Sequence, residues 1–84
     1  NYIMSSNNEK LIALISRVLD IDKNSITDLT SPENTESWDS FNALVMVSEL
    51  ELEFEVHFSI EEVYSVTCVK DIRDVLRRHD VVFS

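Results

Sequence analysis

The chain has 84 residues, enough for one small domain with a modest core. Its 16 acidic and 7 basic residues give a formal net charge of −9, which disfavours nucleic acid and anionic membranes and favours basic protein surfaces as partners. No glycine-rich phosphate loop is possible with 0 glycines, and 1 proline is compatible with a mostly helical fold. The single cysteine excludes an internal disulfide, and without an apolar span or signal segment we expect a cytoplasmic protein with no membrane insertion.

The first predicted helix runs from Asn7 to Leu19. Ser6 and Glu9 have the spacing of a capping box, in which each side chain accepts a hydrogen bond from the other residue's backbone. Behind this start, apolar residues recur every three or four positions, which predicts one buried face. These residues are Leu11, Ile12, Ile15, Val18 and Leu19.

Residues 20–39 form a long connection, which is uncommon unless the loop is functional or partly ordered. Ile26 and Leu29 are its predicted apolar anchors, and Pro32 with the polar residues after it argues against a long helix. Trp38 is the large side chain at its end. Packing against the helices and direct contact with a partner are both open for it, and we favour packing because its ring has a large apolar area.

The second predicted helix runs from Ser40 to Phe54, with Asp39 as its N-cap. Its apolar residues fall on two opposite sides at helical periodicity. The predicted core side comprises Ala43, Met46, Val47, Leu50 and Phe54. The second side comprises Phe41, Leu44, Val45 and Leu52, with Ser48 among them and Glu49, Glu51 and Glu53 between the two sides. This pattern leaves two interpretations, an unusually wide core or a docking face that begins beside Ser40.

Two further helices complete the prediction. Ser59 and Glu62 form a second capping-box pattern, which opens a short helix ending near Ser65. Thr67 is the predicted cap of a last helix from Cys68 to His79. The apolar tail, residues 81–83, either packs back on the domain or frays. The sequence therefore predicts an all-α domain with three longer helices, one short helix and a long first loop.

This order of elements, with Asp39-Ser40-Phe41 at the start of the second helix, resembles the acyl carrier proteins and their Asp-Ser-Leu motif. The similarity extends through the loop before Ser40, the acidic helix end at residues 51–54, and the segments 60–63 and 67–69. It implies a four-helix carrier bundle and a single carrier domain over residues 1–84. We expect Asn1 to Ile3, which precede Met4, to be an expression remnant.

The resemblance implies that Ser40 carries a 4′-phosphopantetheine arm and that Asp39 is the acid of the motif. A phosphopantetheinyl transferase would attach the arm from coenzyme A. The arm's thiol would then carry an acyl thioester between acyl-activating, acyl-transferring and synthase enzymes of fatty-acid, polyketide or related biosynthesis. Because the partner enzymes supply the chemistry, we expect no catalytic residue and no metal ligand. We also expect a monomer, although the second apolar side of the helix leaves pairing of two copies open.

Two groups of residues are expected to serve this function. The predicted partner-docking residues are Phe41, Leu44, Val45, Ser48, Glu49, Glu51 and Leu52. The core residues predicted to shelter a short acyl chain, in addition to their ordinary packing, are Val47, Leu50, Phe54, Ile60, Val63 and Val66.

Several positions depart from the family pattern. Ser37 and Trp38 stand where carriers often have a glycine, and Phe41 replaces the usual leucine. Val45, Ser48 and Leu52 occupy positions that are often acidic or long and apolar in fatty-acid carriers. We therefore expect a different or narrower partner set than a general fatty-acid carrier has, and a peptidyl or aminoacyl carrier stays an alternative.

A calcium site is not expected, although the first loop opens with suitable spacing. Asp20, Asp22 and Asn24 match the first ligands of an EF-hand loop. However, Ser25 replaces the required glycine and Ser31 replaces the bidentate glutamate. The segment is better explained as a helix end followed by a turn.

An enzyme is also disfavoured by the residues present. His57 and His79 lie in separate regions. Cys68 has no obvious general base near it in the sequence, and we expect it to be a small buried residue. The stronger rival is a helical interaction domain that resembles a carrier and uses the second apolar side of the Ser40–Phe54 helix. Substituting Ser40 would be nearly silent in such an adaptor, whereas Leu44→Asp or Leu52→Asp would damage it.

Overall fold

A computed structural model describes residues 6–83, and it contains α-helices and one 3-10 turn. The elements are α1 (Asn7–Leu19), η1 (Lys23–Ser25), α2 (Ser40–Phe54), α3 (Ile60–Ser65) and α4 (Val69–Arg78). The predicted all-α bundle of three longer helices and one short helix is therefore confirmed for this part of the chain. The expected remnant, Asn1 to Ile3, lies outside the described residues.

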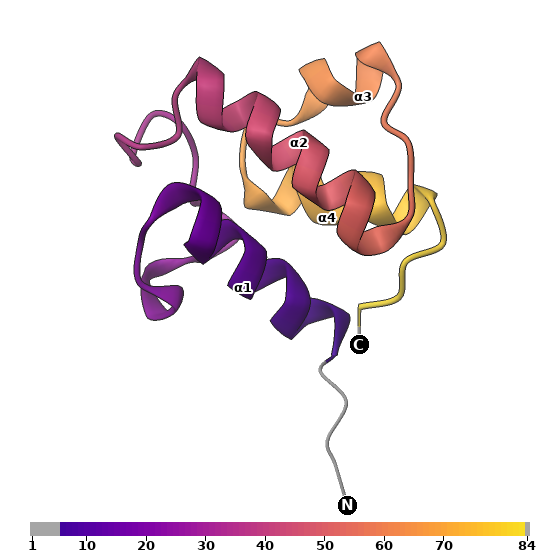
Figure 1. Ribbon diagram of the computed structural model, residues 1–84, viewed down its shortest axis with the longest axis horizontal. Coiled ribbons are helices and arrows are strands. Elements are labelled where there is room, and N and C mark those ends of the chain that lie inside the picture. The colour runs from indigo at the N-terminus through magenta and orange to yellow at the C-terminus, as the bar shows by residue number, and fades with distance from the viewer. Residues whose placement is uncertain (1–5, 84) are drawn as a thin grey trace, which may run out of the picture.

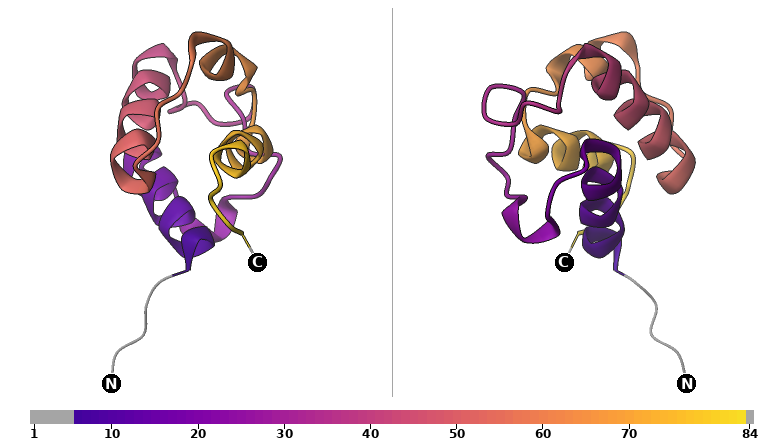
Figure 2. Two further views of the ribbon diagram at one scale, coloured as in Figure 1. Left: turned by 90° about the vertical axis from the view of Figure 1, so that its right-hand side faces the viewer. Right: turned by 60° about the vertical axis from the view of Figure 1, so that its left-hand side comes forward.

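The three longer helices surround a common apolar centre. In Figure 1, α1 and α2 run side by side in opposite directions, and α4 lies behind them. Figure 2 shows α2 and α4 on opposite sides of the bundle with α3 above them. The fully buried side chains of this core are Leu11, Leu14, Ile15, Leu19, Met46, Leu50, Val69, Ile72, Val75 and Leu76.

Both predicted capping boxes are present. In α1, the Ser6 hydroxyl accepts from the Glu9 N–H at 3.1 Å, and the Ser6 N–H donates to Glu9 Oε1 at 2.9 Å. In α3, the Ser59 hydroxyl accepts from the Glu62 N–H at 3.1 Å, and the Ser59 N–H donates to Glu62 Oε1 at 2.9 Å. These reciprocal bonds satisfy two backbone donors at each helix start.

The start of α4 differs from the prediction. Cys68, not Thr67, is the N-cap, its side chain makes no capping hydrogen bond, and it is half-buried instead of fully buried. The Thr67 hydroxyl and N–H instead both donate to Asp71 Oδ2, at 2.6 and 2.9 Å. These bonds lower the pKa of the Asp71 carboxyl from its ordinary value because they favour its ionised form.

The long loop supplies the cap that Cys68 does not. The carbonyl oxygens of Thr30 and Asp28 accept the N–H groups of Val69 and Lys70, at 2.9 and 3.1 Å. The loop is thus fixed to the first turn of α4, although the two segments are far apart in sequence.

One of the two predicted anchors of this loop is wrong. Ile26 is buried, but the Leu29 side chain is 77% exposed. Leu29 lies inside a tight turn in which the Thr30 N–H donates to the Thr27 carbonyl at 3.1 Å, and the turn directs its side chain to solvent. The apolar anchoring of the loop therefore comes from Ile26 and from Trp38, which is 5% exposed and has the packing role favoured above.

The apolar tail packs back on the bundle, which settles the alternative left open by the sequence. The Phe83 ring lies 6.5 Å from the Phe54 ring and beneath the guanidinium groups of Arg73 and Arg77. The Asn7 side chain donates to the Val82 carbonyl at 3.0 Å, which joins the tail to the start of α1. Across residues 6–83, no helix combines the length and apolarity that crossing a bilayer requires.

Candidate functional site

Ser40 is the first residue of α2, and it is exposed. Asp39 precedes it as the N-cap in extended conformation, and its carboxylate accepts from the Asn42 N–H at 2.8 Å. The Asn42 side chain then donates to the Ser37 carbonyl at 2.8 Å. Asn42 therefore ties the end of the long loop to the first turn of the helix and fixes the place of Ser40.

The helix end around Ser40 suits a phosphate ester. Among residues 6–83, none accepts a hydrogen bond from the backbone N–H of Ser40 or Phe41, and no acidic residue occupies the first turn of α2. Unpaired N–H groups and the positive end of the helix dipole both favour a negative group there. The Ser40 hydroxyl also makes no hydrogen bond within the described chain, so it is free to be esterified.

An open depression lies beside Ser40 on the surface. Its volume is about 350 Å³, and it is lined by Pro32, Trp38, Asp39, Ser40 and Ala43. It leaves room for a flexible arm to lie along the protein or to extend from it.

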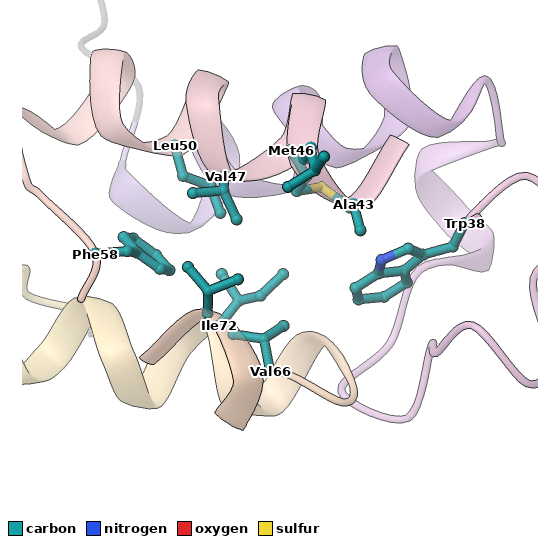
Figure 3. A pocket seen from close by; sticks show the side chains of 10 residues that line it. Trp38, Ala43, Met46, Val47, Leu50, Phe58, Val66 and Ile72 are labelled. Carbon is teal, nitrogen blue, oxygen red and sulfur yellow. The ribbon is translucent and has the colours of Figure 1, made fainter. Parts of the chain in front are cut away.

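A smaller apolar cavity lies deeper between α2, α3 and α4, with a volume of about 60 Å³. Figure 3 shows α2 side chains on one side, Val66 and Ile72 on the other, and Trp38 and Phe58 at the two ends. The residues that line it are Trp38, Ala43, Leu44, Met46, Val47, Leu50, Phe58, Val63, Val66 and Ile72.

The predicted sheltering residues divide into two groups in the structure. Val47, Leu50, Val63 and Val66 line the cavity, whereas Phe54 and Ile60 do not. Phe54 contacts Phe83 of the tail, and the Ile60 side chain is 74% exposed because it begins α3 on the outer side. Sequence reasoning missed the contributions of Trp38, Phe58 and Ile72, and it assigned Leu44, which also lines the cavity, to the docking face alone. It had placed Ala43 and Met46 on the core side of α2 without assigning them to a sheltering site.

A comparison with protein-family models gives a match over residues 9–76 to the family described as "Phosphopantetheine attachment site". The chain belongs to this family. It is therefore a phosphopantetheine carrier protein, and its cofactor is covalently bound 4′-phosphopantetheine. The resemblance to acyl carrier proteins is confirmed at this level. A search of curated proteins gave no significant match.

The outer face of α2 in this carrier is apolar and exposed. Phe41, Leu44 and Leu52 are 73%, 67% and 75% exposed. Ser48 is also exposed on this face, and Val45 is half-buried. The wide-core interpretation of α2 is thus wrong for the three large side chains, which are left available at the surface.

The two predicted docking carboxylates are engaged within the fold. Glu49 Oε1 accepts from the Arg17 guanidinium of α1 at 2.9 Å. Glu51 Oε2 accepts from the Phe58 N–H at 2.8 Å and lies 3.4 Å from His57 Nδ1. They flank the exposed apolar face on its two sides, and each also links α2 to a neighbouring segment.

A contact joins α3 to His79, the residue that follows α4. His79 Nε2 lies 3.0 and 3.1 Å from the two Glu62 oxygens, and its ring stacks on Phe58 at 6.3 Å. The Ser59 N–H hydrogen bond, then the His79 contact, lowers the pKa of Glu62 below its ordinary value of 4.5. The ionised carboxylate therefore favours the folded state.

Glu62→Gln is expected to make the protein lose less stability at acid pH than the wild type loses. Because folding lowers the pKa of Glu62, its contribution is complete above pH 4.5 and is lost as pH falls through the lowered value. Glutamine can keep the capping box without the charge. Thermal unfolding between pH 7 and about pH 3 should show a smaller drop in Tm for the variant than for the wild type. Glu61→Gln, at an exposed neighbour, should keep the wild-type dependence, and equal profiles for all three proteins would refute this role.

The other candidates from the sequence gain no chemical role. Within residues 6–83, no group of three or more His, Cys, Asp or Glu residues is placed to hold a metal ion. Asp22 caps η1 by accepting from the Asn24 N–H at 2.8 Å, which fits the turn interpretation of that segment. His57 is exposed, and Cys68 is a free cysteine at the start of α4.

Proposed function

We propose that Ser40 is the attachment serine and that this carrier presents acyl thioesters to enzymes of fatty-acid, polyketide or related biosynthesis. The observation that carries the proposal is the position of Ser40, exposed at the first residue of α2 and inside the matched region 9–76. Asp39 has the role of motif acid because its carboxylate caps the helix and fixes the adjacent turn. Uptake of one phosphopantetheine by the wild type, and none by a Ser40 variant, tests this assignment.

The residues of the chain position the arm and carry out no bond-making step in this proposal. When bound, the arm supplies a thiol that forms the thioester. The unpaired N–H groups at the start of α2 favour its phosphate, and the depression beside Ser40 gives it room. The flexible arm raises the local concentration of the cargo at each partner's active site, so the carrier needs no catalytic side chain.

The exposed face of α2 is the proposed docking surface, formed by Phe41, Leu44, Val45, Ser48, Glu49, Glu51 and Leu52. Its apolar centre supports partners with apolar docking surfaces, and the net charge of −9 supports faster encounter with basic ones. Because Glu49 and Glu51 are held in internal contacts, the centre of the surface carries little free negative charge. This supports a partner set that differs from that of a general fatty-acid carrier.

Adding an acid at the centre of this surface should change the partner preference. Leu52→Glu is expected to raise kcat/KM with fatty-acid synthase enzymes about three- to tenfold, because the carrier gains a negative charge that attracts a basic partner surface. Steady-state kinetics with the loaded carrier as substrate would measure this change. Asn24→Asp adds the same charge on the exposed first loop and should have little effect. No gain for Leu52→Glu, or an equal gain for both variants, would contradict the assignment of the surface.

A second candidate is an adaptor that uses the carrier fold for protein binding alone. It is favoured by the exposure of Leu44 and Leu52, which is high for large apolar side chains in a small domain. In an adaptor, Leu44→Asp would abolish partner binding and Ser40→Ala would be silent. In a carrier, Ser40→Ala abolishes function whether or not the docking surface is intact.

A further inference from the structure

The depression beside Ser40 and the apolar cavity are separated by a shared wall. Trp38 and Ala43 line both spaces, and Ala43 contributes only a methyl group. In Figure 3, the Trp38 ring stands at one end of the cavity and Phe58 at the other. The indole is therefore the large side chain between the attachment site and the interior.

The backbone of Trp38 is fixed, but its ring is held by packing alone. The Trp38 N–H donates to the Thr35 carbonyl at 3.0 Å, and the preceding Ser37 carbonyl accepts from Asn42. Between residues 6 and 83, no acceptor receives a hydrogen bond from the indole N–H. This nitrogen is not among the fully buried unpaired atoms, so it reaches solvent although the residue as a whole is 5% exposed. The position of the ring thus depends on the apolar contacts around it.

The cavity behind this wall is small. Its volume of about 60 Å³ is well below the roughly 150 Å³ of an engineered apolar cavity that binds benzene. The walls are closely packed aliphatic and aromatic side chains, which resist expansion. A short acyl group fits such a space, whereas a medium-length chain requires that a wall residue move or be smaller.

We infer that Trp38 is a specificity-determining residue that restricts the sheltered cargo to short acyl chains. This inference rests on the proposed attachment at Ser40. The indole stands between the depression and the cavity, and the cargo's chain length determines whether it can be accommodated in the space that the ring leaves free. A smaller residue at position 38 joins the two spaces and allows longer chains to enter.

The test compares acetyl and octanoyl cargo on wild type, Trp38→Leu and Trp38→Phe. A promiscuous phosphopantetheinyl transferase loads each protein directly from acetyl- or octanoyl-coenzyme A, and intact mass confirms loading. Hydroxylamine then cleaves the thioester to a hydroxamate and the free thiol, and the rate reports how far the thioester is sheltered. For each protein we take the ratio of the octanoyl rate to the acetyl rate. This ratio removes any difference between the proteins that affects both thioesters equally.

For Trp38→Leu, the octanoyl-to-acetyl ratio is expected to fall on the order of tenfold below the wild-type ratio, because about two more methylene groups become buried. Trp38→Phe, which preserves more packing, should change the ratio in the same direction by a smaller factor. Tyr64→Leu removes an 81% exposed aromatic ring from α3 and should leave the ratio unchanged.

Two results would overturn the inference, and they are distinguishable. In the first result, both Trp38 variants are folded by circular dichroism and load normally, and their octanoyl-to-acetyl ratios equal the wild-type ratio. Trp38 would then not restrict the cargo, and the proposed function would stand. A wild type that gains no mass, beside a control carrier that does, would overturn the proposed function and this inference together. Trp38→Phe also decides the inference if Trp38→Leu does not fold.

Discussion

Ser40→Ala is expected to remain unmodified after incubation with coenzyme A, Mg²⁺ and a promiscuous phosphopantetheinyl transferase, whereas the wild type gains one arm. The substitution removes the oxygen that accepts the phosphopantetheinyl group, so the effect on loading is complete. The Ser40 side chain is exposed and makes no hydrogen bond within the described residues, so the free energy of unfolding should change by less than about 0.5 kcal/mol. Intact mass and thermal unfolding measure the two effects.

The matched control for this experiment is Ser65→Ala. Ser65 is another exposed serine, at the end of α3, and its hydroxyl donates to the Glu62 carbonyl. This variant should gain the arm as the wild type does. Modification of Ser40→Ala would show that another residue accepts the arm, and a large loss of stability would show that Ser40 has a structural role that its exposure does not indicate.

Leu50→Ala is expected to cost about 2–5 kcal/mol of the free energy of unfolding, because it enlarges a cavity in a closely packed core. Leu50 is 1% exposed and lines the cavity near the middle of the α2 core side. For a small domain with a total stability of about 5–15 kcal/mol, this is a large fraction. Urea denaturation followed by circular dichroism at 222 nm, a helix-sensitive wavelength, would show the midpoint shift to lower urea.

Leu52→Ala is the control on the same helix. Leu52 is 75% exposed, so its truncation should change the free energy of unfolding by no more than about 0.5 kcal/mol. Similar destabilisation by the two substitutions would contradict the orientation of α2, in which Leu50 faces the core and Leu52 faces the proposed docking surface.

Local signals in the sequence were sufficient to predict most of the helices. The bounds of α1 and α2 match the prediction, because Ser6 and Asp39 are strong N-caps and the apolar residues after them keep a helical period. The α3 capping box of Ser59 and Glu62 was equally local. The C-terminal ends of α1 and α2 are capped by Asp20 and Glu55 in left-handed conformation. Glycine usually occupies this position, but the chain has no glycine.

The errors arose where a distant segment decides the local structure. Thr67 looked like the cap of α4, but the loop carbonyls of Asp28 and Thr30 satisfy its first N–H groups, and α4 begins after Cys68. Ile60 looked like a sheltering residue, but its side chain at the start of α3 is 74% exposed. Neither the hydrogen bonds from the loop to α4 nor the exposure of Ile60 is indicated by residues close to these positions in the sequence.

The candidate site divides in the same way. The place of Ser40 at the start of α2 followed from Asp39 and the pattern after it, and the structure has it there. Helical periodicity also separated Leu50 from Leu52 correctly. It did not predict that Trp38 would stand between the depression and the cavity, because that position depends on how the long loop returns to α2.

The most direct measurement is the location of the arm on the loaded wild type. Digestion after glutamate yields a peptide of residues 37–49, which contains Ser37, Ser40 and Ser48 and can be fragmented in the mass spectrometer. The proposed function predicts that the phosphopantetheine is found on Ser40 alone. An arm on any other residue, or no arm while a control carrier is loaded by the same transferase, would contradict it.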